Sequence, residues 1–217
     1  MTTETIHFSM RSAFRAALIA VVRVAPISVE VSANGMVLTR TAGSFIEDGF
    51  AVGDEVTISG FAAAGNNGKT QITDWSATTM TVAKALEAES ATISMSVCLP
   101  ESRHWEGFAF QPVLGVPFVD ENFLIVSNNV ASLGGGGMQR HVMSAVAKLN
   151  YPQKIGTRAI ELMAGRLCKV FEPGVSLSRD GDVGSVIRTG RSRLRHDPDW
   201  VSCDIVVDIE AFSLRGP

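Results

Sequence analysis

Four arginines lie close together near the end of the chain, at Arg188, Arg191, Arg193 and Arg195. If residues 183–195 form a strand, side chains alternate between its two faces, and the last three arginines share one face. Guanidinium groups bind carboxylates and phosphates, often through two parallel hydrogen bonds. The arginine run therefore predicts a surface that binds acidic groups.

Three kinds of partner fit the arginine run, and the sequence leaves all three open. The arginines can pair with acidic residues of the next strand, contact a neighbouring subunit, or contact DNA that passes through a ring. Asp204, Asp208 and Glu210 alternate along the predicted last strand, which favours pairing within the chain. Arg140, on another predicted strand, is a further candidate for contact with a neighbouring subunit.

The most glycine-rich stretch of the chain is Gly134, Gly135, Gly136 and Gly137. A phosphate-binding loop needs a GK[ST] motif and a helix N-terminus after its glycines. Neither is present, because the next segment predicts a strand. We interpret the glycines as a flexible loop that becomes ordered only on docking, and as a second candidate contact.

No residue pattern in the sequence is typical of catalysis or of metal binding. The histidines are scattered, and none has metal-ligand spacing with another histidine or a cysteine. There is no G-x-S-x-G motif around a serine. Residues 179–182 begin like a calcium loop, but the glutamate expected later in such a loop is missing. The sequence predicts that the protein is not an enzyme and has no catalytic residue, cofactor or metal.

The composition indicates a folded protein. The chain has 217 residues, of which 46% are hydrophobic and 19% charged, enough for one domain or two small ones. Its net charge of −3 gives no general attraction to nucleic acid. The 3 cysteines show no pairing pattern, which indicates reduced thiols. The apolar run at residues 16–22 is shorter than the about 20 residues that span a bilayer, so we expect no membrane association.

The first hundred residues predict a helix followed by a β-rich region. Apolar side chains at helical spacing predict a helix over residues 6–24 that ends before Pro26. Residues 27–99 contain short alternating runs, with separate strands at residues 79–82 and 91–97. Asn34-Gly35 predicts a hairpin turn, and the residues Gly65-Asn66-Asn67-Gly68 suggest an exposed loop tip. We expect this region to be a small all-β barrel or sandwich.

The second half of the chain predicts an α+β arrangement in which strands flank one helix. The expected elements are strands at residues 122–126, 138–149, 183–195 and 201–209, and a helix at residues 160–171. In the last strand, alternate apolar residues face the core and acidic residues occupy the other face.

Several short motifs follow these elements in a fixed order. They are His104-Trp105-Glu106-Gly107, Pro117-Phe118, Met138-Gln139-Arg140-His141, Tyr151-Pro152, Gly156-Thr157 and Asp197-Pro198-Asp199-Trp200. Together with the N-terminal helix, their order resembles the tail terminator-like family of bacteriophages. The resemblance covers residues 5–25 and 103–213. It leaves residues 27–99 as an insertion.

The resemblance implies a fold, a function and a set of partners. The fold is α+β, with a small mixed sheet packed by two helices from residues 1–26 and 100–217, and an inserted β domain at residues 27–99. The function is to cap the phage tail tube as a six-fold ring at the tail–neck junction, after assembly in the bacterial cytoplasm. The implied partners are further copies of the chain, the tail tube protein and the head–tail connector, with DNA passing through the lumen.

Two other functions stay open at this stage. The chain could be another head–tail joining protein or minor tail protein, because such proteins share this kind of fold. Alternatively, the β region could bind carbohydrate on a host surface through loops near residues 61–68.

Overall fold

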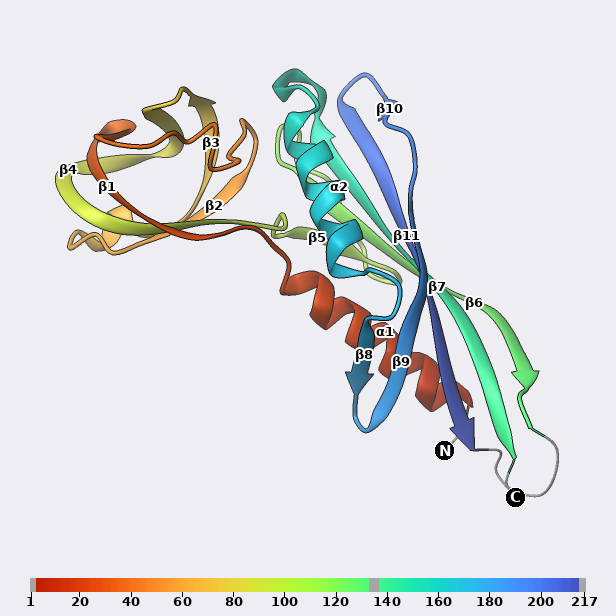
Figure 1. Cartoon of the computed structure of the whole chain (residues 1–217). Helices are drawn as coiled ribbons and strands as arrows, with labels where there is room; N and C mark the ends of the chain where they lie inside the picture. The colour runs from red at the N-terminus through yellow and green to blue at the C-terminus, as the bar shows by residue number, and fades with distance from the viewer. Residues whose placement is uncertain (1–2, 133–136, 215–217) are drawn as a thin grey trace.

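The computed structural model describes residues 3–132 and 137–214, which form two curled sheets and two α-helices (Figure 1). The helices are α1 (Thr3–Ile19) and α2 (Arg158–Val170), and the short 3-10 helices are η1 (Ala64–Asn66) and η2 (Gln153–Ile155). The first sheet contains β1 (Val22–Arg40), β2 (Glu55–Ser59), β3 (Gly68–Trp75) and β4 (Thr79–Cys98). The second contains β5 (Ser102–Trp105), β6 (Phe118–Val130), β7 (Met138–Pro152), β8 (Ser176–Arg179), β9 (Asp182–Arg191), β10 (Arg195–His196) and β11 (Trp200–Leu214). The chain is therefore an α+β protein.

Helix α1 forms because its apolar side chains recur at helical spacing. The fully buried ones are Ile6, Met10, Phe14 and Leu18. They lie on one face of the helix and pack against the second sheet. The helix ends at Ile19, not at residue 24 as predicted. The valines from Val22 onward pair with β4 instead, since β-branched residues favour strands.

The hairpin predicted at Asn34-Gly35 is wrong. Strand β1 continues through these residues and pairs with β4 along nearly its whole length. Gly35 has a φ of 63°, and the register shifts on both sides of it, so this dipeptide forms a bulge and not a turn. The two strands predicted at residues 79–82 and 91–97 are both part of β4, because β1 provides hydrogen-bonding partners along the stretch between them.

The first sheet is curled because β4 pairs with three strands. Besides β1, it pairs with β2 through residues 94–97 and with β3 through residues 80–82, and β2 pairs with β3. The strands β4, β2 and β3 thus form a closed cycle of pairings, in which each strand pairs with the other two. The barrel or sandwich expected for this region stays a prediction.

The second sheet has the order β5-β6-β7-β11-β9-β8, with β10 also pairing with β11. It is mixed, because β5 runs parallel to β6 and the other neighbours are antiparallel. In β11, Ile205, Val207 and Ile209 are fully buried and alternate with partly exposed residues. Both α-helices cover the face with the buried residues, and no described helix covers the opposite face (Figure 1). We call this opposite side the open face.

The two sheets meet at a joint between the start of β1, the loop before β2 and the region around α2. Arg166 of α2 donates a 2.8 Å hydrogen bond from Nε to the carbonyl oxygen of Val22. Ile155 lies directly against Gly53, so that a Cβ added at Gly53 would overlap the Ile155 side chain. Gly53 also has a φ of 87°, a conformation that favours glycine.

We expect Gly53→Ala to lower the free energy of unfolding by about 2–4 kcal/mol, because it strains the backbone and displaces Ile155. Gly68→Ala is the matched control, since Gly68 has a φ of 96° but no atom within 4 Å of the added Cβ. Urea unfolding measures both losses. Equal losses would show that the Ile155 contact contributes nothing to the joint.

Candidate interaction surfaces

The open face of the second sheet carries a row of ion pairs. Arg188 contacts Asp208 at 2.7 Å, and Arg195 contacts both carboxylate oxygens of Asp204 at 2.7 Å. A third pair joins Arg140 of β7 to Glu210 of β11. The prediction that acidic residues of the last strand pair with the arginine run within the chain is therefore confirmed for Arg188 and Arg195, whereas the role of Arg140 as a contact with a neighbouring subunit stays a prediction.

The arginine run does not form one continuous strand face, as the sequence had predicted. β9 ends at Arg191, and residues 192–194 form an irregular segment before β10. Arg191 is opposite the helix-side residue Ile205, whereas Arg195 reaches Asp204 on the open face. The segment breaks the alternation because Ser192 bonds to Asp204 through both its backbone and its hydroxyl. Arg191 and Arg193 are exposed and form no ion pair with the described residues.

The glycine loop lies largely outside the described residues, which do not include Gly134, Gly135 and Gly136. Gly137 is buried and directly precedes β7. Next to it, Met138 accepts hydrogen bonds at its carbonyl oxygen from the backbone of Ala131 and Ser132. The role of the glycines as a docking contact stays a prediction.

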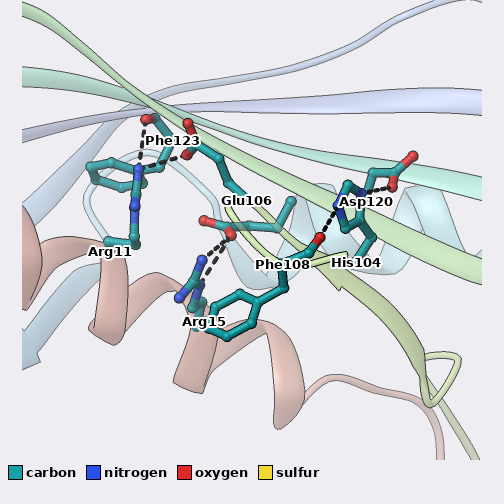
Figure 2. Close-up of polar contacts among 8 residues, drawn as sticks. Arg11, Arg15, His104, Glu106, Phe108, Asp120 and Phe123 are labelled. Atoms are coloured by element: carbon teal, nitrogen blue, oxygen red, sulfur yellow. Dashed lines mark hydrogen bonds and ion pairs between the residues drawn. The ribbon is translucent and has the colours of Figure 1, made fainter. Parts of the chain in front are cut away.

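A polar cluster fastens α1 to β5 and β6 (Figure 2). Arg15 binds the Oε2 atom of the buried Glu121 through two nitrogens, at 2.6 and 3.0 Å. One turn earlier, Arg11 bonds to Glu106 at 2.6 Å and to the carbonyl oxygen of Phe123 at 3.1 Å. The sequence signal for this cluster is the spacing of Arg11 and Arg15, which lie one turn apart on helix α1.

A second set of polar contacts on the same strands involves His104 of β5. Its ring nitrogens contact the Asp120 carboxylate and the Phe108 carbonyl oxygen, each at 2.9 Å (Figure 2). The His104 ring also stacks on Phe110, with the centroids 5.3 Å apart. These contacts hold the chain after β5 against the sheet. The contacts of these polar groups position backbone and helix.

Two buried histidines lie where α1 meets the far end of the sheet. The rings of His7 and His141 are 5.2 Å apart and nearly perpendicular. His141 contacts the Asn128 amide oxygen at 2.9 Å and the Ser213 hydroxyl at 2.8 Å. Burial lowers the pKa of both histidines, and the positive charge of one would further disfavour that of the other.

We expect the chain to lose stability as the pH falls below about 6.5, the pKa of a histidine in an unfolded chain. The folded state then binds fewer protons than the unfolded state, so the free energy of unfolding decreases with decreasing pH. Each histidine contributes at most about 1.4 kcal/mol per pH unit. Thermal unfolding between pH 7.5 and 5 measures this loss. His141→Gln should reduce it and the exposed His196→Gln should not; an equal effect of both variants would contradict the assignment.

Of the predicted exposed tip at residues 65–68, Gly65 and Gly68 are exposed and Asn67 is half-buried, but the Asn66 side chain points inward. Asn66 is fully buried, Phe61 is 6% exposed, and the amide of Asn67 bonds to the backbone of Phe61. Glu89 accepts hydrogen bonds from the backbone of Ala62 and Ala63, which lowers the pKa of its carboxyl. The side-chain amides of Asn66 and Asn67 are thus bonded within the β region, and carbohydrate binding by this loop stays a prediction.

Among the described residues, no group of histidine, cysteine or acidic side chains is arranged to hold a metal. The described helices are too short or too polar to cross a bilayer. An α+β protein with a sheet face free of helices is suited to binding other proteins through extended surfaces.

Comparison with known proteins identifies the family. The family model described as phage tail terminator protein matches residues 81–208, more than half of the chain. The chain therefore belongs to the phage tail terminator family, which is a structural component of phage tails. A solved structure matches at 15% identity and a TM-score of 0.42, and the match covers 55% of this chain and 83% of that structure's chain. No curated protein sequence matches.

Proposed function

We propose that the chain closes into a six-fold ring on the end of the phage tail tube, stops its growth, and forms the junction to the neck. Membership of the tail terminator family carries this proposal. The open face supports it, because the sheet offers neighbouring copies a broad surface with no helix in the way. A head-to-tail contact that closes gives such a ring without further parts.

The mechanism we propose is steric capping. One side of the ring matches the end of the tube, and the other side does not present the surface to which another tube subunit would add. Residues 27–99 form an inserted β domain on this ring. We propose Arg140, Arg188, Arg191, Arg193, Arg195 and residues 134–137 as contacts with neighbouring copies or with the tube. Because only Arg191 and Arg193 lack an intramolecular ion pair among these described arginines, they are the first choices.

Ring formation is tested by light scattering over a range of concentrations, followed by negative-stain imaging of the largest species. A closed ring is the expected result, alone or together with tail tube protein. A chain that stays monomeric and does not bind tube ends would overturn the proposal. Arg191→Glu combined with Arg193→Glu should weaken the ring, whereas Arg179→Glu, at the distant turn between β8 and β9, should not.

A further inference from the structure

Two strands of the second sheet have long edges that no described strand covers. β5 pairs with β6 only along residues 118–121, so no described strand pairs with this edge of β6 from Asn122 onward. On this stretch Arg11 donates a 3.1 Å hydrogen bond to the Phe123 carbonyl oxygen. β8 pairs with β9 only along residues 182–185. Val186 bonds to the backbone of residues 174 and 175, so that β9 is free from Ile187 onward.

The two free edges lie at the same level along the strand direction, as the residue register across the sheet shows. The register leads from Asn122 across β7 and β11 to Gly190. In the same way it leads from Leu124 to Arg188. The first free residues of β6 are therefore level with the free residues of β9 on the opposite side of the sheet.

We propose that the β9 edge of one copy pairs with the β6 edge of the next, so that the second sheet continues from copy to copy around the ring. This inference rests on the proposed ring and names the contact that closes it. A ring built by rotation alone has no shift along its axis. When the strands run along that axis, joined edges must therefore lie at the same height, as these do.

The strand directions also agree with this contact. Three antiparallel pairings separate β6 from β9, so the two edges run in opposite directions. A copy related by rotation then adds its β9 to β6 as an antiparallel neighbour, the geometry that most of the sheet already has. No turn or new connection is required.

The β6 edge has the apolar character of a buried contact. Leu124, Ile125 and Val126 are 52%, 55% and 61% exposed. Beside them, a groove of about 340 Å³ between α1 and β6 is lined in part by Phe8, which is 67% exposed. Monomeric proteins avoid such edges, since an uncovered apolar strand pairs with other chains. On β9, Ile187 is 40% exposed and supplies an apolar partner.

Charge complementarity selects the same arrangement. Arg191 is the last residue of β9 and Arg193 lies in the segment after it, and neither forms an ion pair with a described residue. The register places Arg191 level with Trp105 of β5, and Glu106 follows directly. The Glu106 side chain is 44% exposed although it contacts Arg11. Antiparallel addition brings the two free arginines of one copy to this carboxylate of the next, which helps to fix register.

Cysteine cross-linking tests the contact. Leu124→Cys and Arg188→Cys place one thiol on each edge, at the same height and on the open face, where paired strands bring Cβ atoms within disulfide range. Each variant is purified separately, and the two are oxidised alone and after mixing. We expect covalent dimers only in the mixture, and a ladder of multimers from a chain that carries both substitutions. Glu30→Cys, on the exposed side of β1, replaces Leu124→Cys as the control and should give no ladder.

Each other outcome contradicts the inference in a distinct way. Rings in negative stain without a cross-link would overturn this contact but leave the ring itself intact. Covalent dimers of Leu124→Cys alone would show that two β6 edges pair with each other. The absence of both rings and cross-links, with tail tube protein present, would overturn the inference together with the proposed function.

Discussion

Asp54→Ala lowers the free energy of unfolding by about 3–5 kcal/mol, the largest loss that we expect from a single substitution in this chain. Asp54 is fully buried and forms an ion pair with Arg23, whose side chain is 4% exposed. Its Oδ2 atom also accepts a 2.7 Å hydrogen bond from the backbone of Ala51. Without the carboxylate, the Arg23 guanidinium stays buried with no opposite charge.

The environment of Arg23 shows why the loss is large. Burial lowers the pKa of its guanidinium to about 10, so it remains charged at neutral pH. Its remaining partner is the Gly49 carbonyl oxygen at 3.0 Å, and its Nε atom has none among the described residues. A buried charge without a counter-ion is among the most costly defects in a folded protein.

Urea unfolding of Asp54→Ala measures this effect. The control is Arg188→Ala, which breaks an ion pair whose arginine side chain is 75% exposed, and which should cost less than about 1 kcal/mol. Asp54→Asn should fall between the two, because it keeps the shape and an acceptor for Ala51 but removes the charge. A loss below about 1 kcal/mol for Asp54→Ala would contradict the role of the pair.

Arg15→Ala is the second large effect, with an expected loss of about 3 kcal/mol. Arg15 is the partner of the buried Glu121, whose second oxygen, Oε1, has no partner in the described chain. It also lies over the Trp105 ring, 5.1 Å from the centroid. Removing it breaks one of the two arginine links between α1 and the sheet and leaves a carboxylate buried alone.

A double-mutant cycle separates the charge from the packing. Glu121→Gln removes the charge and keeps the shape, so Arg15→Ala should cost less in its presence than in the natural chain. Arg11→Ala is the control, because both Arg11 and Glu106 are partly exposed and should contribute less. Additive losses for Arg15 and Glu121 would show that the two side chains do not act together.

The elements with strong periodicity could be predicted from the sequence. The apolar stripe from Ile6 to Leu18, the helix that became α2 and the alternation along β11 all appear near their predicted positions. In each case the pattern arises from burial of one face, which the sequence records directly. The motifs of the second half also led to the tail terminator family, which the family match confirms.

The predictions that the structure contradicts fail because residues far apart in the sequence pair with one another. Asn34-Gly35 favours a turn locally, but β4 provides hydrogen-bonding partners on both sides, and the dipeptide becomes a bulge. The arginine run alternates in sequence, yet the bonds between Ser192 and Asp204 interrupt the strand. No local pattern shows that Asn66 is buried by contacts with Glu87 and Glu89. At each of these positions, tertiary contacts determine the conformation and burial of the residues.

For the candidate interaction surfaces too, local sequence patterns predict some contacts, and others depend on the tertiary structure. Acidic residues on alternate positions of the last strand predicted its pairing with Arg188 and Arg195 correctly. The free edges of β6 and β9 could not be predicted, because strand order depends on which distant strands meet. The separation of Arg191 and Arg193 from the paired arginines also appears only in the folded chain.

Tail length in particles that lack this chain tests the capping account most directly. In a phage whose gene for this chain is deleted, the account predicts tails longer than normal and variable in length by negative-stain imaging, because nothing ends addition of tube subunits. Restoring the natural chain should return the normal length. Tails of normal length beside unattached heads would contradict capping and assign the chain to head–tail joining.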